Sequence, residues 1–353
     1  FFIQDIYEGE GLKGIPRGTV KSLRLHAYEY AYVKTRSDHN WHGIQSGWDI
    51  KRMLGTVPVE EDGSVIFKAP ANTPISIQPL DKDGVAIQWM RSWVTGQPGE
   101  VVSCIGCHED QNQIAIPKRV IASQKAPSAL TLPEGGTRSF TFDLEVQPIL
   151  DRACIACHNG EGKAFDLRGG KKDKLGYGTS YLNLHPYVHR QGGEGDMVVL
   201  QPYEYHPNTS ELVRLLKKGH HNVKLTDKEW KTLYNWIDYN APDKGYFNAN
   251  VLTDLPYKGF DQIKRRKELT DKYANGAGVD WKKEIADYAD YLKKQGPITP
   301  VMPEKAAPVK EKTLKVKGWP FGADRIKEML AKEKETRKVV EIAPGVKVNF
   351  VRI

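Results

Sequence analysis

The chain has 353 residues, of which 39% are hydrophobic, and a formal net charge of +8 at pH 7. This length and apolar content suffice for two or three packed domains and exclude a disordered chain. No run of eighteen apolar residues occurs, so we expect no membrane span. The excess of lysine lies in stretches mixed with acids and without interleaved aromatic residues, which predicts solvated surface and no nucleic-acid partner.

Residues 1 to 103 have the alternating apolar positions of strands. Val57 to Phe67, around Asp62-Gly63, and Ile75 to Trp89, around Asp83-Gly84, each predict a hairpin. Alternation of this kind is typical of a sheet with one buried face. We therefore expect a small β-sandwich over residues 21–126.

All four cysteines belong to two copies of one motif. The copies are Cys104-Ile-Gly-Cys107-His108 and Cys154-Ile-Ala-Cys157-His158. Two thiols at this spacing reach the two vinyl groups of one porphyrin, and the adjacent histidine becomes an axial ligand of the iron. The sequence therefore predicts two covalently bound haem c groups, attached through Cys104, Cys107, Cys154 and Cys157, with His108 and His158 as proximal iron ligands.

Other cysteine chemistry fits the motifs less well. A structural zinc site needs four thiolates, but 46 residues separate Cys107 from Cys154, more than in a zinc ribbon. Disulfides and thioredoxin-like pairs do not require a histidine after each pair. Because thioether-linked haem matures outside the cytoplasm, we expect a periplasmic or otherwise exported protein. The chain starts at Phe1 without a leader, as expected of a mature form or fragment.

The sixth ligand of the first haem stays open. Met90 has the opposite strand parity to Ile87 and Trp89 and is one candidate, although a thioether also fills core space. His39 and His42 lie in a polar loop and are further candidates, where solvated histidines are the common case.

A helical cytochrome c-like domain is predicted over residues 137–247. Val146, Ile149 and Leu150 share a helix face, and Pro148 suits the first turn of a helix that delivers Cys154. A second helix follows Ser210, and a capping box of Thr226 to Glu229 opens a third.

The last two helices bracket Gly219-His220-His221. A loop held between packed helices can fix an imidazole over a haem, so His220 is the preferred distal ligand and His221 the alternative. A surface histidine pair at a helix C-terminus is the competing interpretation. His185, His189 and His206 lie beside prolines or in a loop and rank lower.

Residues 248–318 predict a helical and linker segment, with the linker itself at 300–317. Beyond it, residues 323–334 predict a helix and residues 339–350 two strands with a turn.

Several segments resemble hydrazine synthase alpha-subunit-like proteins over about residues 1–247. They are Asp5-Ile6-Tyr7, Pro16 to Val20, Val59 to Phe67, Met90 to Ser92, Pro98 to Cys104, Pro202, His206-Pro207, Leu212-Val213, Gly219-His220-His221 and Trp236 to Pro242. The resemblance implies a β-propeller before this region, ending near residues 1–20. It also implies His158 and His220 as axial ligands of an electron-transfer haem. In that family a tyrosine four residues after the first motif ligates the first haem, whereas this chain has Asn112, so we expect it to lack the synthase activity.

A second, shorter resemblance concerns residues 319–353. Trp319-Pro320-Phe321 and Val340 to Val346 look like the opening of formylglycine-generating sulfatase-modifying domains. The expected architecture is multidomain α+β: the end of a propeller, a β-sandwich with a haem, a helical cytochrome domain, a linker and the start of an α/β domain.

The leading hypothesis is a periplasmic di-haem electron-transfer module whose partner is a redox protein. The alternative is an enzyme that acts on a small nitrogen or oxygen compound at an open first haem. A non-redox scaffold with structural haems is a third.

Overall fold

The computed structural model describes residues 1–30, 43–44, 49–110, 112, 114, 116–174, 176–192, 199–245, 268–269, 271–273, 279–304, 322–332, 337–343 and 346–351. The chain divides into two compact units, residues 1–305 and residues 306–353. Among the described helices, none has the length and apolar character needed to cross a membrane.

Two sheets form the β part of the first unit. One has the order β5 (Ile75–Leu80), β2 (Ser22–Tyr30), β3 (Asp49–Pro58) and β7 (Arg138–Ser139), with antiparallel neighbours. The other has the order β4 (Val65–Ile66), β1 (Phe2–Ile3) and β6 (Ser103–Cys104), and β1 runs parallel to β6. Apolar residues of both sheets share one core, which includes Ile3, Leu23, Leu25, Val57, Val65 and Phe67.

The hairpin predicted at Val57 to Phe67 is wrong in its pairing. The turn around Asp62-Gly63 does form, and in it Glu60 donates its N–H to the Ser64 carbonyl at 3.0 Å. Its two arms nevertheless enter different sheets, since β3 pairs with β2 and β7 while β4 pairs with β1. Pro58 ends β3, where its missing N–H removes a ladder bond.

The main sheet is buried on both faces, not on one as predicted. Leu23 and Leu25 of β2 point into the shared β core and are fully buried. Arg24 and His26 point to the opposite face and are also buried, at 7% and 0% exposure. The second face is covered because the helical part of the chain packs on it.

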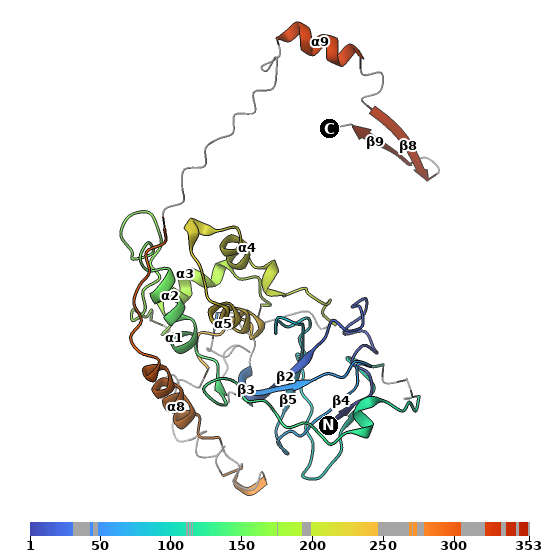
Figure 1. The fold of residues 1–353 in the computed structure, drawn as a ribbon, viewed down its shortest axis with the longest axis vertical. Coiled ribbons are helices and arrows are strands. Elements are labelled where there is room, and N and C mark those ends of the chain that lie inside the picture. Colours follow the sequence, from blue (N-terminus) through green and yellow to red (C-terminus); the bar gives the residue numbers. More distant parts are fainter. Residues whose placement is uncertain are drawn as a thin grey trace. The chain divides into compact units, whose positions relative to one another are not determined.

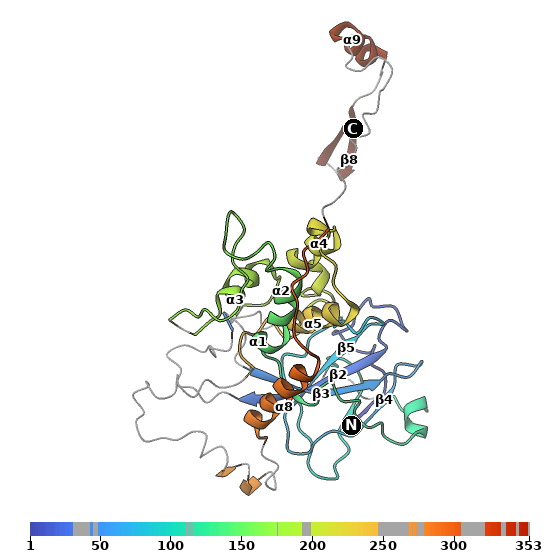
Figure 2. The same cartoon turned by 60° about the vertical axis from the view of Figure 1, so that its left-hand side comes forward.

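That helical part consists of short helices around a second core. They are α1 (Phe142–Glu145), α2 (Gln147–Ala153), α3 (Thr179–Leu184), α4 (Glu211–Lys217) and α5 (Asp227–Asp238). Short 3₁₀ turns stand at Ile121–Gln124, His185–Tyr187, Pro207–Thr209 and His220–Asn222. Phe142, Tyr181, Val213, Trp236 and Ile237 lie at the centre of the core. Both views place these helices on one side of β2, β3 and β5, with the N-terminus on the other (Figures 1 and 2).

Several predicted helix features are confirmed. Pro148 lies in the first turn of α2, and Ile149 and Leu150 are buried. The capping box of Thr226 and Glu229 opens α5. Ser210 precedes α4 as expected, but its hydroxyl does not cap that helix and instead accepts the His189 N–H at 3.0 Å.

Charged pairs join the sheet to the helices. Arg24 of β2 contacts Asp238 of α5 at 2.9 Å in a fully buried ion pair. Arg52 of β3 binds Glu284 of α8 (Trp281–Lys294) at 2.5 Å, and the Tyr288 hydroxyl donates to Glu145 at 2.8 Å. The sheet and the helices are therefore one packed body.

The second unit contains α9 (Ala323–Lys332) and a hairpin of β8 (Arg337–Ala343) and β9 (Val346–Val351). The predicted helix and strand pair at this end are confirmed. Most of the predicted 300–317 linker lies outside the described residues.

Candidate functional site: two Cys-x-x-Cys-His turns

The first motif is a turn held by the N-terminal segment of the chain. Cys104 stands in β6, and its carbonyl accepts the Gln4 N–H at 3.0 Å. Cys107 donates its N–H to the Glu8 carbonyl at 2.8 Å and accepts the Gly11 N–H at 3.0 Å. Residues 4–11 thus form the backbone scaffold on which the two thiols are set.

This scaffold explains the glycine inside the first motif. A Cβ added at Gly106 would lie 2.2 Å from the Glu8 carbonyl oxygen, which is closer than any real contact. The Glu109 carboxylate also accepts the backbone N–H groups of Ile105 and Gly106. Glu109 therefore closes the turn from the other end.

The thiols of the first motif pack against the shared β core. Burial raises the pKa of Cys104, and it raises the pKa of Cys107 to about 12. Burial likewise raises the pKa of Cys154 in the second motif to about 12. None of the four cysteines forms a disulfide.

His108 differs from its counterpart in the second motif. Its backbone is left-handed, with φ of 55°, and its side chain is exposed. Met90 lies against the main sheet, where its carbonyl accepts hydrogen bonds from the Tyr28 and Ser76 hydroxyls. Met90 remains a candidate ligand, while His39 and His42 fall outside the part of the chain that the structure describes.

The second motif continues helix α2 by one turn. Cys154 donates its N–H to the Leu150 carbonyl at 2.8 Å, and His158 donates its N–H to the Cys154 carbonyl at 2.9 Å. Cys154 is half-buried against the helical core, and Cys157 is exposed. One turn of chain thus presents two thiols and an imidazole together.

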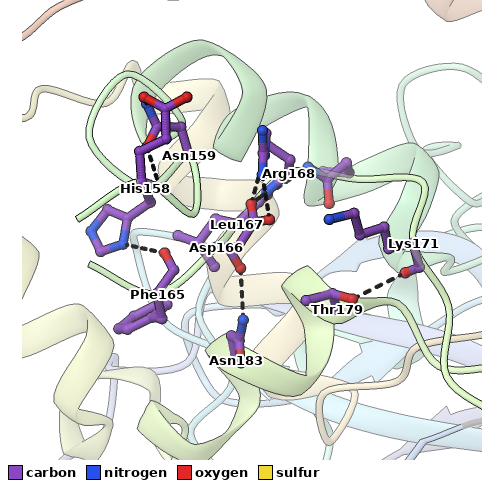
Figure 3. Close-up of polar contacts among 11 residues, drawn as sticks. His158, Asn159, Phe165, Asp166, Leu167, Arg168, Lys171, Thr179 and Asn183 are labelled. Carbon is purple, nitrogen blue, oxygen red and sulfur yellow. Dashed lines mark hydrogen bonds and ion pairs between the residues drawn. The ribbon is translucent and has the colours of Figure 1, made fainter. Parts of the chain in front are cut away.

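The orientation of His158 is fixed by the loop that follows it (Figure 3). Its Nδ1 lies 3.1 Å from the Phe165 carbonyl, which only accepts, so Nδ1 carries the proton. The loop is held in turn by Asn183, whose amide donates to the Asp166 carbonyl at 2.8 Å. This arrangement leaves the Nε2 lone pair of His158 for a metal, as in histidine ligands fixed by a carbonyl.

His220 is a ring neighbour of His158. Their ring centroids are 6.2 Å apart with an interplanar angle of 36°. A metal–imidazole bond is about 2 Å and the ring nitrogen lies about 1.1 Å from the ring centre, so two imidazoles on one metal have centroids about 6.2 to 6.4 Å apart. The separation of the His158 and His220 rings therefore matches that of two imidazoles on one iron, and these residues fit a haem by this measure.

The loop that carries His220 has an unusual backbone. Gly219, His221 and Asn222 have φ of 87°, 45° and 61°. The left-handed turn leaves His221 exposed while His220 is half-buried, and partial burial lowers the pKa of His220. Of the two histidines, His220 is the one placed beside the second motif.

The lower-ranked histidines are engaged elsewhere. His185 stacks on Tyr181 at 5.5 Å. His189 shares a hydrogen bond of 2.9 Å with the Thr209 hydroxyl, and His206 accepts the Asn208 N–H at 3.2 Å. The sequence patterns missed Phe165 and Glu109, because a carbonyl acceptor seven residues away and a carboxylate on a turn have no periodic signal.

Residues 18–109 match the family model "Hydrazine synthase alpha subunit middle domain". A structure titled "Kuenenia stuttgartiensis Hydrazine Synthase" aligns with a TM-score of 0.48 and 16% identity, over 69% of this chain and 43% of that one. The chain thus spans less than half of that relative, and no curated protein matches it. The family match thus concerns residues 18–109, which are similar to the middle domain of the hydrazine synthase alpha subunit.

Proposed function

We propose that this chain is a di-haem c-type cytochrome module that transfers electrons outside the cytoplasm. The observation that carries the proposal is the pair His158 and His220, whose ring centroids lie 6.2 Å apart. His158 directly follows Cys157 in the second motif. A haem bound there supplies one-electron redox chemistry.

The protein's own residues perform distinct tasks at the second site. Cys154 and Cys157 would attach the porphyrin. The Phe165 carbonyl fixes His158 in the Nδ1–H tautomer, which makes the imidazole a stronger ligand. His220 would supply a second imidazole to the iron, and two protein ligands would favour electron transfer over binding of substrate.

The first site supports an alternative function, a haem enzyme acting on a small nitrogen or oxygen compound. The exposed side chain of His108 favours it, because a haem at that position is reached from solvent. The Asn112 side-chain amide donates a hydrogen bond to the Asp110 carboxylate at 3.1 Å. Asn112 thus provides an amide where the resembled family has a ligating tyrosine. We therefore propose chemistry other than hydrazine synthesis at this site.

For the second unit, we propose the opening of a formylglycine-generating-like domain. The support is the order of α9, β8 and β9 together with the motifs named above. It adds no active-site residue to the electron-transfer function.

Absorption and EPR spectra of the purified holo-protein, with and without carbon monoxide, test the proposal. Two haems, of which the second is low-spin and ignores carbon monoxide, are expected. Carbon monoxide binding at the first haem alone would favour the enzyme function at His108. A second haem that is high-spin would contradict the role of His220.

A further inference from the structure

The two motifs stand in different parts of the first unit, and a series of contacts leads from one to the other. At the first motif, a Cβ added at Gly11 would lie 2.6 Å from the Cys107 Sγ, so the Gly11 backbone touches this thiol. The buried Gln88 amide donates to the Gly11 carbonyl at 2.9 Å and to the Leu200 carbonyl at 2.6 Å. Gln88 thereby joins the first motif to the helical part of the chain.

Aromatic rings continue the series from Gln88. The N–H of Trp89 donates to the Gln88 side-chain oxygen at 2.8 Å. The buried Trp89 ring stacks on Tyr205 at 5.2 Å with an interplanar angle of 21°. Tyr205 in turn contacts His189, with ring centroids 5.0 Å apart.

The series ends at the second motif. His189 and Tyr187 flank the buried Val188 on one short stretch of chain. Tyr187 stacks on Phe165 at 5.5 Å, and the Phe165 ring lies 4.7 Å from the His158 ring. Phe165 therefore contacts His158 twice, through its ring and through its carbonyl.

We propose that Trp89, Tyr205, His189, Tyr187 and Phe165 form an aromatic relay that carries an electron between the two haems. The proposal rests on the function proposed above. In the transfer, ferrous iron at one motif is oxidised to ferric and ferric iron at the other is reduced to ferrous. No bond forms or breaks and no proton moves.

The physical reason is that successive rings of the relay contact one another, except His189 and Tyr187, which are connected through the backbone of Val188. Ring centroids in contact along the relay lie 4.7 to 5.5 Å apart, which is the range of packed aromatic pairs. Packed and bonded groups couple donor and acceptor better than a gap does. A second aromatic group, Tyr181, Phe142 and Trp236, lies in the helical core and makes no ring contact with Trp89 or Tyr205 among the described residues.

The test uses the full-length holo-chain. After flash photoreduction, freeze-quench EPR follows the two ferric signals and gives the rate of inter-haem equilibration. His189→Ala removes an exposed ring and should slow that rate about tenfold, equivalent to about 1.4 kcal/mol in barrier height. His189→Phe keeps a ring and should restore most of the rate, and both midpoint potentials should stay unchanged.

Two further variants complete the design. Tyr205→Leu breaks the relay at a different ring and should slow the rate similarly. Trp230→Leu is the matched control, because Trp230 stacks on Tyr234 at 5.5 Å and has no ring contact with a relay residue in the described part of the chain, and it should leave the rate unchanged.

Unchanged rates in His189→Ala and Tyr205→Leu, with both haems present, would overturn the relay and leave the cytochrome function intact. A wild-type chain without haem would instead overturn the cytochrome function, and the relay with it.

Discussion

The His158 ring donates from Nδ1 to the Phe165 carbonyl, and its centroid lies 6.2 Å from that of the His220 ring. The carbonyl fixes the Nδ1–H tautomer of His158 and leaves its Nε2 without the proton. This geometry distinguishes the second motif from the first, where His108 is exposed.

The first prediction separates the two neighbouring histidines. His220→Ala should convert the second haem from low-spin to high-spin and allow it to bind carbon monoxide, because the sixth ligand is lost. His221→Ala is the matched control and should keep the wild-type spectrum, since His221 is exposed. The reverse pattern in the EPR spectra would make His221 the ligand.

The second prediction concerns the one position at which the two motifs differ, which is Gly106 in the first and Ala156 in the second. Gly106→Ala gives the first motif the sequence of the second, yet its Cβ would lie 2.2 Å from the Glu8 carbonyl oxygen. The variant should lose the first haem and keep the second, as counted by intact mass. Ala156→Gly should keep both. Full haem loading in Gly106→Ala would show that residues 4–11 do not constrain this turn.

The third prediction concerns the buried pair of Arg24 and Asp238. Asp238→Ala leaves the Arg24 guanidinium buried without its carboxylate, which should lower the free energy of unfolding by about 3 to 5 kcal/mol. Urea unfolding measures the change. Asp83→Ala, at the exposed pair with Lys82, should have no measurable effect. Equal stabilities of the two variants would mean that Arg24 finds full compensation in Asn235 and Gln78.

The fourth prediction is a pH dependence that His26 creates. Burial, then Lys51 and Arg24, hold the pKa of His26 well below its usual value of 6.5, and neither ring nitrogen has a hydrogen-bond partner in the described structure. The unfolded chain therefore binds a proton below about pH 6.5 that the folded chain does not, so stability should fall on acidification by up to about 1.4 kcal/mol per pH unit. Urea unfolding at pH 7.5 and pH 5.5 measures it. His26→Leu should lose less stability over this range, and identical losses would exclude His26 as the source.

The sequence predicted local features better than long-range pairing. The capping box at Thr226 and the place of Pro148 in α2 depend on nearby residues, and the structure confirms both. The partner of β4 could not be predicted, because β1 lies some sixty residues away and consists of two residues. Burial of Arg24 and His26 was also missed, since charged and polar positions on a strand normally mark an exposed face.

The candidate site was predictable where chemistry lies in one turn of chain. Each Cys-x-x-Cys-His motif is local, and the place of His220 between two helices made it a candidate whose role as a ligand stays a prediction. Residues that shape the sites came from elsewhere: Glu8 and Gly11 around Cys107, and Phe165 beside His158. Their roles depend on tertiary contact, for which a single sequence has no signal.

The most direct test of the account is the number of covalently bound haems per chain. Intact mass and the pyridine haemochrome spectrum of the full chain, exported from a host that matures c-type cytochromes, measure it. The account predicts two haems, and one after Cys154 and Cys157 are both replaced by alanine. A folded chain that carries no haem under these conditions would contradict it.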